Sequence, residues 1–513
     1  MLKLEVAKFF KNNCIYILGA IAVLALFFLR LYHLTILPIF ADEAIYIRWA
    51  QVMKAEETLR FLPLSDGKEP LFMWAIIPFL KFIHNPLFAG RLVSVLSGFG
   101  TMIGISYLSY LLFKSKKVAL VAALMYAISP FAFFFDRMAL VDSMLSMFGV
   151  WMFIFAYLAF TKKRLDFAMI AGFALGGAWL TKSPALFFAL MLPTLWLFAG
   201  WPKGKKAVLL NLVKLLGLSI ATWVIGYGMY NILRLGPNFS LIASRNLDYV
   251  WPMSHILTDP LDPLKPFVDR SFQWIEMMGP WVMLVLAIGG ILANLKKHWR
   301  QVIVLFVWFL GPIMVQSEFA KVLTARYILF SIPFLVILAG SVFTIQKKKW
   351  ILIFAVILAF FVAQALVFDR GLLVNPEKAN LPRSERSGYL EEWTAGQGIY
   401  EISVFLKNER KNLPAGRQVV VGTEGYFGTL PDGLQAYMND TPSVIVVGVG
   451  LNFDELPLPL IDSRKAGNKT YFVVNKSRYH PNPAQFGLKI IDEYPKAVAP
   501  DGSRDSLLLM EVI

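Results

Sequence analysis

The sequence has few of the side chains that build disulfide frameworks or metal clusters. Cys14 is the only cysteine among the 513 residues, which excludes an intrachain disulfide and a cysteine metal site. The five histidines are scattered and show no metal-ligand spacing of the HExxH kind. Charged residues are also scarce, at 16% of the chain. Any chemistry must therefore rest on a small number of carboxylates, lysines and arginines.

The sequence is rich in long hydrophobic runs. Hydrophobic residues make up 57% of the chain and the mean hydropathy is +0.59, which is more apolar than a soluble domain requires. The net charge of +16 comes from basic clusters between the apolar runs. Basic residues at such places orient a membrane protein, so they do not indicate a nucleic-acid partner. We expect a polytopic integral membrane protein with a largely α-helical fold.

Eleven apolar runs are candidate membrane spans, although some are shorter than the roughly 20 residues that a helix needs to cross a bilayer. The first run is followed by no small-residue cleavage site, so we expect it to remain as an uncleaved span. The eleven are Cys14–Leu34, Phe88–Phe113, Val118–Phe135, Met138–Phe160, Phe167–Leu180, Ala185–Gly200, Ala207–Leu233, Trp274–Leu295, Val302–Val315, Tyr327–Ile345 and Trp350–Phe368.

A twelfth run, Leu71–His84, determines the predicted orientation. It is short and contains Pro78 and Lys81. If it lies along the surface, every basic cluster falls on one side of the membrane, as the positive-inside rule prefers. We therefore expect a cell-membrane protein with a cytoplasmic N-terminus. The clusters are Lys3/Lys8/Lys11, Lys114/Lys116/Lys117, Lys162/Lys163/Arg164, Lys203/Lys205/Lys206, Lys296/Lys297/Arg300 and Lys347/Lys348/Lys349.

After about Asp369 the composition becomes that of an ordinary soluble protein. A helix is expected over Gln397–Lys407, followed by five β-rich runs, QVVVGT, SVIVVGV, TYFVVN, LKIIDEY and SLLLMEVI, with Gly, Pro and Asn turns between them. The predicted domains are thus a membrane domain at 1–369, with a first outer loop at about 35–87, and a small extracytoplasmic α/β domain at 370–513.

The first outer loop has the most suggestive charges. Asp42–Glu43 begins the stretch ADEAIYIRWAQ, whose apolar residues fall at helical spacing and predict an amphipathic surface helix. Lys68–Glu69 follows before the surface segment. Asp42 is a candidate general base; its structural alternative is that of a helix N-cap.

Four further charges lie at the predicted outer ends of spans. Asp142 enters a span, where a carboxylate costs about 2.5–3.5 kcal/mol and needs a partner, either a structural ion pair with Arg137 or a site role. Lys182 and Arg326 are each commonly explained as anchors. Together with Lys68 and Arg137, they could instead form a ring of cations that binds a phosphate.

The order of ADEAIY, GKEPLFMW, FDRMALVDSML, LTKSPAL and ARYILF resembles the GT-C superfamily, in particular the branch of protein O-mannosyltransferases and the lipid A aminoarabinose transferase. The resemblance covers about Leu31–Leu335. It implies that Asp42 is the base, that Lys68 and Lys182 are the lysines of the family's KPP-like and TKG-like motifs, and that Asp142 is the acidic residue after the second outer loop. From the residues themselves, we expect Glu43 to join Asp42 and Asp142 at the catalytic centre. The candidate substrate-binding residues are Tyr46, Lys68, Glu69, Arg137, Lys182, Arg326 and Tyr327.

The chain departs from the family pattern at two places: KEP stands where KPP is usual, and TKS where TKG is usual. These departures leave open the acceptor and a metal-ligand role for Glu69. A divalent metal ion held by Glu43 and Glu69 is a possible cofactor.

The expected activity is inverting transfer of a sugar from a polyprenyl-phosphate carrier to a protein, lipid or glycan acceptor on the outer face. Two alternatives are a transporter or flippase of a lipid-linked saccharide, and a non-enzymatic sugar-binding protein. A transporter more often shows internal repeats and helices broken near mid-membrane, and a binding protein would not need Asp42.

Overall fold

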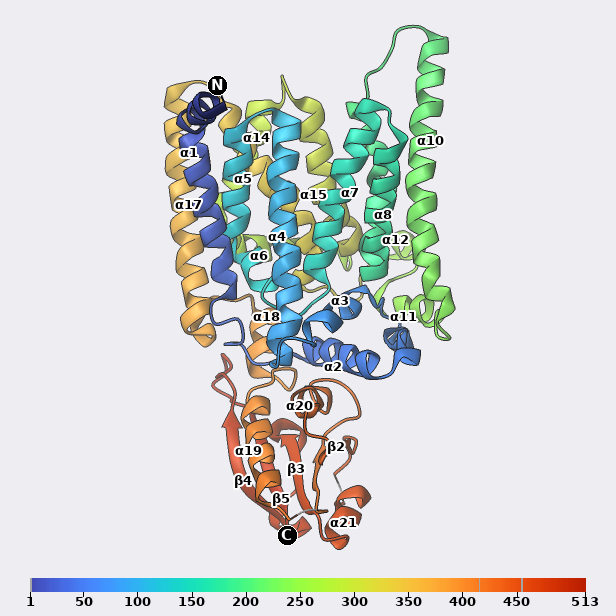
Figure 1. The fold of residues 1–513 in the computed structure, drawn as a ribbon, viewed down its shortest axis with the longest axis vertical. Coiled ribbons are helices and arrows are strands. Elements are labelled where there is room, and N and C mark those ends of the chain that lie inside the picture. Colours follow the sequence, from blue (N-terminus) through green and yellow to red (C-terminus); the bar gives the residue numbers. More distant parts are fainter. Residues whose placement is uncertain (1, 415, 454) are drawn as a thin grey trace.

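The computed structural model describes residues 2–414, 416–453 and 455–513, with backbone only for residues 2–12, which include Lys3, Lys8 and Lys11. Figure 1 shows a bundle of long helices with a small α/β domain below it. The N-terminus lies at the far end of the bundle from this domain (Figure 1). The predicted fold class, a helical membrane protein with a small C-terminal α/β domain, is confirmed.

The bundle is built from the expected apolar runs. In the part of the chain that the structure describes, seven helical segments are long and apolar enough to cross a membrane. They are Asn13–Leu31, in α1 (Leu2–Phe28) and η1 (Leu29–Leu31); α4 (Pro86–Phe113); α7 (Asp142–Lys162); Lys205–Leu235, in α10 (Lys205–Tyr230) and η6 (Asn231–Leu235); α15 (Trp299–Phe319); Ala325–Thr344, which contains η7 (Ala325–Ser331), α16 (Ile332–Gly340) and η8 (Ser341–Thr344); and α17 (Lys348–Val374). The predicted number of eleven spans is therefore not confirmed.

The remaining runs are helical but short or broken. Val118–Phe135 is divided at Ser129–Pro130 into α5 (Lys116–Ile128) and α6 (Pro130–Phe135). Phe167–Leu180 lies in α8 (Leu165–Thr181). Ala185–Gly200 lies mostly in a short apolar helix made of η4 (Ser183–Ala185), α9 (Leu186–Met191) and η5 (Leu192–Phe198). The run Trp274–Leu295, expected as a single span, is bent, because α13 (Leu264–Met278) and α14 (Val282–Asn294) meet there at 103°. Gly279 and Pro280 lie at this bend, where a straight helix would lose backbone hydrogen bonds.

A layer of short helices separates the bundle from the outer domain. It contains α2 (Ala41–Ala55), α3 (Leu71–Phe79) and α11 (Leu241–Tyr249), which lie across the end of the bundle (Figure 1). With its 9 residues, α3 is about 14 Å long, too short to cross a membrane. The expectation that Leu71–His84 does not span agrees with this length.

The outer domain contains a five-stranded sheet in the order β2-β1-β3-β5-β4. All five β-rich runs form the expected strands: β1 (Val419–Thr423), β2 (Val444–Gly448), β3 (Lys469–Asn475), β4 (Leu488–Pro495) and β5 (Ser506–Val512). β1 is parallel to β2 and β3, whereas β5 is antiparallel to β3 and β4. The expected helix is α19 (Ile399–Asn412), and α20 (Asp432–Met438) and α21 (Leu458–Lys465) complete the domain.

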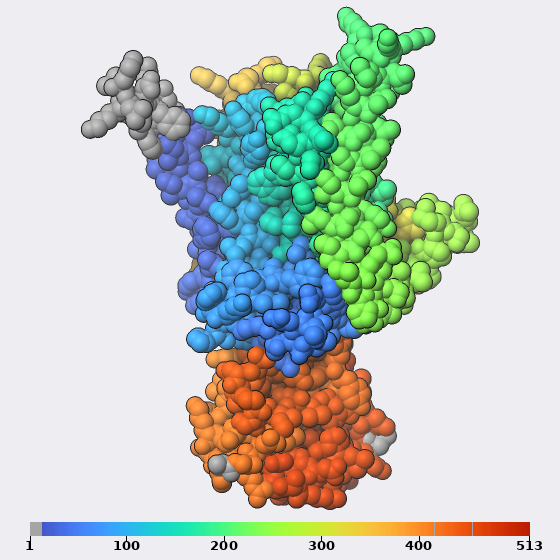
Figure 2. Space-filling model, turned by 45° about the vertical axis from the view of Figure 1, so that its right-hand side comes forward, coloured from blue at the N-terminus to red at the C-terminus, as the bar shows by residue number. Residues whose placement is uncertain are grey.

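The outer domain docks on α2. Gln51 Nε2 donates to the Ala436 carbonyl oxygen at 2.9 Å, and Arg48 Nε donates to Gln435 Oε1 at 3.2 Å, both on α20. One hydrophobic core runs without interruption from the bundle through α2 into α19, α20 and the sheet. In Figure 2 the segment that contains α2 and α3 (blue) lies directly against the outer domain (orange). The end of the bundle is thus covered on the side where the candidate site lies.

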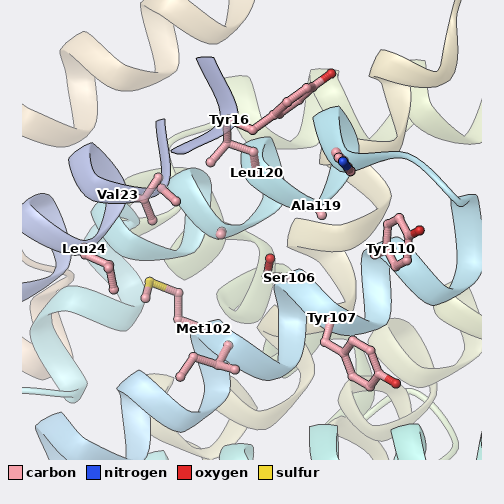
Figure 3. A pocket seen from close by; sticks show the side chains of 13 residues that line it. Tyr16, Val23, Leu24, Met102, Ser106, Tyr107, Tyr110, Ala119 and Leu120 are labelled. Atoms are coloured by element: carbon pink, nitrogen blue, oxygen red, sulfur yellow. The ribbon is translucent and has the colours of Figure 1, made fainter. Parts of the chain in front are cut away.

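A largely apolar groove of about 530 Å³ lies between α1, α4 and α5, in the half of the bundle that is farther from α2. Figure 3 shows Met102, Leu24 and Val23 lining it, with Tyr16 and Tyr110 toward one end. Because this groove lies away from α2, it is separate from the candidate site.

Candidate active site

The site is centred on Asp42, the second residue of α2. Its carboxylate binds two cations that come from distant parts of the chain. Arg326 Nη2 lies 2.6 Å from Asp42 Oδ2, and Lys68 Nζ lies 3.4 Å from Asp42 Oδ1. The structure thus brings three of the predicted site residues together from α2, the loop before α3 and η7.

The interpretation of Asp42 as a helix N-cap is wrong. The N-cap of α2 is Phe40, and its backbone N–H donates to Glu43 Oε2 at 3.0 Å. The neighbouring carboxylate, Glu43, therefore caps the helix. The Asp42 carboxylate therefore interacts with its two cations and does not cap the helix.

Glu43 does not join the Asp42 cluster. It is fully buried and forms a two-point ion pair with Arg91 on α4, at 2.8 Å and 2.7 Å. Glu43 Oε1 also accepts the backbone N–H of Ala139 at 2.6 Å. Both oxygens of the Glu43 carboxylate therefore already accept hydrogen bonds. These contacts link α2 to α4 and to the α6–α7 loop, so the geometry of Glu43 is that of a structural residue.

A second ion pair lies beside the first. Lys182 Nζ lies 2.6 Å from Asp142 Oδ1, so the partner of Asp142 is Lys182 and not Arg137, the structural partner considered from the sequence. Lys182 also stands 4.0 Å over the ring of Tyr327, and the Arg326 guanidinium stands 5.4 Å from the same ring. Tyr327 thus lies between the two ion pairs, each contact being of cation–π type.

Aromatic rings border the cluster on its other side. Lys68 Nζ lies 5.2 Å from the ring centroid of Tyr46 and 5.7 Å from that of Trp49, both on α2. Lys68 also pairs with Asp66 at 3.2 Å. The side chain is thereby held at the edge of the cluster, one quarter exposed.

Arg137 does not join the cluster. It is buried and donates to the backbone carbonyl oxygens of Arg30, Tyr32 and His33, all of which follow α1. Its expected place in the ring of cations is therefore not seen. Its contacts anchor the chain between α1 and α2 instead.

Two residues that the sequence reasoning missed complete the site. Ser183, next to Lys182, donates from Oγ to Glu69 Oε1 at 2.6 Å. Glu385, in α18 (Arg383–Arg386), is buried and accepts the backbone N–H of Ala325 at 3.0 Å, one residue before Arg326. Glu385 is one of several carboxylates in the segment after the last span, and nothing local in the sequence connects it to η7.

The charges set the protonation of the site. Burial opposes ionisation of Asp42, but Arg326 and Lys68 outweigh it and hold its pKa well below the usual range. Burial likewise opposes protonation of Lys68, yet Tyr46, Asp42 and Asp66 raise its pKa above the usual value. Asp42 is therefore ionised and Lys68 protonated across the physiological range.

The two carboxylates expected to hold a metal ion do not fit a shared cation. The Glu43 carboxylate accepts hydrogen bonds from Arg91 and from two backbone N–H groups, and the Glu69 carboxylate accepts one from Ser183. Across the described residues, no group of three or more His, Cys, Asp or Glu side chains has the arrangement of a metal site.

Known proteins resemble either a part of the membrane domain or the fold of nearly the whole chain. Residues 67–226 match the family described as dolichyl-phosphate-mannose-protein mannosyltransferase, a stretch that includes Lys68, Asp142 and Lys182. Among curated proteins no match is found.

Two solved structures have a similar fold along nearly the whole chain. ArnT from Cupriavidus metallidurans, bound to undecaprenyl phosphate, superposes with a TM-score of 0.60 at 14% identity, over 97% of this chain and 98% of that one. The oligosaccharyltransferase AglB from Archaeoglobus fulgidus, in complex with an inhibitory peptide and a dolichol-phosphate, gives a TM-score of 0.50 at 12% identity, over 97% of this chain and 74% of that one.

Proposed function

We propose that this chain, which has the GT-C fold of the ArnT and mannosyltransferase branch, is a membrane glycosyltransferase that uses a polyprenyl-phosphate-linked sugar. The resemblance expected from its motifs is confirmed at the level of the fold. The observation that carries the proposal is the cluster itself: Asp42 between Lys68 and Arg326, beside the Lys182–Asp142 pair.

Three cations shared between two carboxylates are suited to a phosphate leaving group. Lys68, Lys182 and Arg326 provide two ammonium groups and a guanidinium, which bind phosphate oxygens through charged hydrogen bonds. Each of them is already paired with Asp42 or Asp142. A donor phosphate therefore binds by competing with these carboxylates for their cations.

The transfer follows as one displacement. The acceptor hydroxyl oxygen attacks the anomeric carbon of the sugar while the bond from that carbon to the phosphate oxygen breaks. Asp42 takes the proton of the acceptor hydroxyl, and the cations stabilise the charge that develops on the departing polyprenyl phosphate. The anomeric configuration inverts because a single nucleophile attacks opposite the leaving group.

Competition for the cations explains how Asp42 becomes a base. In the free protein, Arg326 and Lys68 keep its pKa too low for efficient proton transfer. When a phosphate draws these cations away, the pKa of Asp42 rises toward the pH of the medium. Binding of the donor thus activates the base that the reaction requires.

The orientation predicted from the basic clusters places this chemistry on the extracytoplasmic face of the cell membrane. The site lies at the end of the bundle covered by the outer domain (Figure 1), whereas the Lys114/Lys116/Lys117 and Lys203/Lys205/Lys206 clusters lie at the opposite ends of their helices. The acceptor, whether protein, lipid or glycan, approaches from the side of this domain.

Consumption of lipid-linked sugar tests the proposal. Purified protein in detergent is supplied with several polyprenyl-phosphate sugars and with peptide, lipid and glycan acceptors. We expect release of polyprenyl phosphate together with a glycosylated acceptor. Consumption of none of the donors, combined with movement of lipid-linked saccharide across vesicle membranes that contain the protein, would replace the proposal with a flippase function.

A further inference from the structure

The two places at which the sequence departs from the family pattern touch each other. Glu69 stands where the KPP pattern has proline, and Ser183 where the TKG pattern has glycine. The two residues are 114 positions apart, yet Ser183 Oγ donates to Glu69 Oε1 at 2.6 Å. Both side chains are absent from the usual pattern, so together they form a polar pair that the pattern lacks.

The pair has the properties of an incomplete binding site. Glu69 is buried, with 5% of its surface exposed. Across the described residues, Ser183 is the only side chain that donates to its carboxylate, and no cation pairs with it. The nearby Lys182 is bound to Asp142 instead. The backbone N–H of Glu69 also donates to the carboxylate. A buried carboxylate is normally paired with a cation, so the lack of one here calls for an explanation.

The position of the pair indicates which part of a substrate it can contact. Glu69 follows Lys68 and Ser183 follows Lys182, so each member of the pair adjoins a cation assigned to the donor phosphate. In the donor, the sugar is attached directly to that phosphate. Glu69 also interacts electrostatically with Lys182. We therefore expect the pair to face the sugar when the lysines hold the phosphate.

We propose that Glu69 and Ser183 bind a hydroxyl group of the transferred sugar and thereby determine which sugar the enzyme accepts. The inference rests on the proposed function. Glu69 accepts the hydrogen bond of the sugar hydroxyl, and the Ser183 oxygen provides a second acceptor beside it. A sugar that lacks this hydroxyl leaves a buried carboxylate without its partner, and this is the strongest form of discrimination available to a binding site.

The experiment compares donor preferences. Wild type, Glu69→Gln, Ser183→Ala and the double variant are supplied with polyprenyl-phosphate sugars that each lack one hydroxyl. The matched controls are Glu57→Gln and Ser65→Ala, which change an exposed carboxylate and an exposed hydroxyl in the same loop. We expect wild type to disfavour one deoxy donor by at least about tenfold in kcat/KM. Glu69→Gln should reduce that preference, because its neutral amide oxygen accepts a weaker hydrogen bond than the carboxylate does. Ser183→Ala should reduce it as well, whereas the controls keep it.

The outcomes separate this inference from the proposed function. If wild type transfers none of the sugars, the proposed function has failed. If wild type transfers sugar but Glu69→Gln and Ser183→Ala slow all donors by the same factor, the pair is structural and the inference is overturned. Ser183→Ala removes only one oxygen from a half-buried side chain, so an unchanged preference in this variant overturns the inference even if Glu69→Gln does not fold.

Discussion

Two carboxylates that are adjacent in the sequence of this protein make entirely different contacts. Asp42 and Glu43 stand side by side in the sequence, but successive helical residues point about 100° apart. Asp42 therefore meets Lys68 and Arg326, while Glu43 turns to Arg91 and the start of α2. The sequence indicated that the pair belongs to the site. Which carboxylate caps the helix and which one binds the two cations depends on contacts with α4 and η7.

The pH dependence of turnover tests the activation of Asp42. Because the ionised form is active, activity falls as the pH drops through the pKa of this group. In the free protein its cations keep that pKa well below the usual range, and donor phosphate binding relieves this effect. We expect the acid limb of kcat, which reports the donor complex, to lie at higher pH than the acid limb that Asp42 sets in kcat/KM. Coincident limbs would contradict the exchange of cations.

Loss of Glu43 is predicted to affect folding. Glu43→Ala leaves Arg91 buried without its ion pair and removes two backbone hydrogen bonds of the carboxylate. Breaking a buried pair of this kind costs about 3–5 kcal/mol. We expect a clear drop in Tm of the detergent-solubilised protein, and Glu57→Ala, at an exposed position, serves as control. A variant with unchanged Tm but no turnover would give Glu43 the catalytic role that was expected from the sequence.

At the scale of elements, the local sequence pattern predicted whether a segment is a helix or a strand. It did not predict how these elements bend or pack against one another. Apolar length identified the bundle helices, and β-branched runs between turns identified all five strands. The 103° bend between α13 and α14 was missed because apolar composition continues across it. The contribution of α18 to the site was also missed, since it depends on a contact across 60 residues of sequence.

Glu385 on α18 is predicted to position Arg326. Its carboxylate accepts the Ala325 N–H at the start of η7, and burial raises the pKa of this carboxyl group. Glu385→Ala frees the start of η7, and we expect about a tenfold loss of kcat/KM or more, since small misplacements in an active site are costly.

Glu385→Gln is the matched variant, because its amide oxygen can still accept the same hydrogen bond. It should retain most of the activity, and it should bind polyprenyl phosphate like wild type. Wild-type kinetics for the alanine variant would show that η7 is positioned without α18.

At the scale of the whole molecule, the outer domain and the bundle share one core. The α2 helix joins them, with its first turn in the site and Arg48 and Gln51 against α20. The domain boundary expected at 369/370 stays a prediction, although α17 continues to Val374. Displacement of the outer domain would move the helix that carries Asp42.

The chain is well suited to a test of orientation because Cys14 is its only cysteine. In a Cys14→Ser background, Ser65→Cys lies in the loop beside the site and Lys203→Cys lies before α10, both at exposed positions. We expect a membrane-impermeant maleimide to label Ser65→Cys in intact cells, and Lys203→Cys only after permeabilisation. The opposite pattern would place the site on the cytoplasmic face and refute the predicted topology.

The central claim is that the Asp42 cluster carries out sugar transfer, and one comparison tests it most directly. Turnover of a polyprenyl-phosphate sugar is measured for wild type and for Asp42→Asn, together with the affinity of each protein for polyprenyl phosphate. We predict that Asp42→Asn folds and binds the carrier at least as tightly as wild type, because its cations are no longer shared with a carboxylate. Its turnover should fall by about 10²–10⁴-fold, the usual contribution of a general base. Unchanged turnover in a folded variant that binds the carrier would contradict the account and assign the chemistry to Asp142.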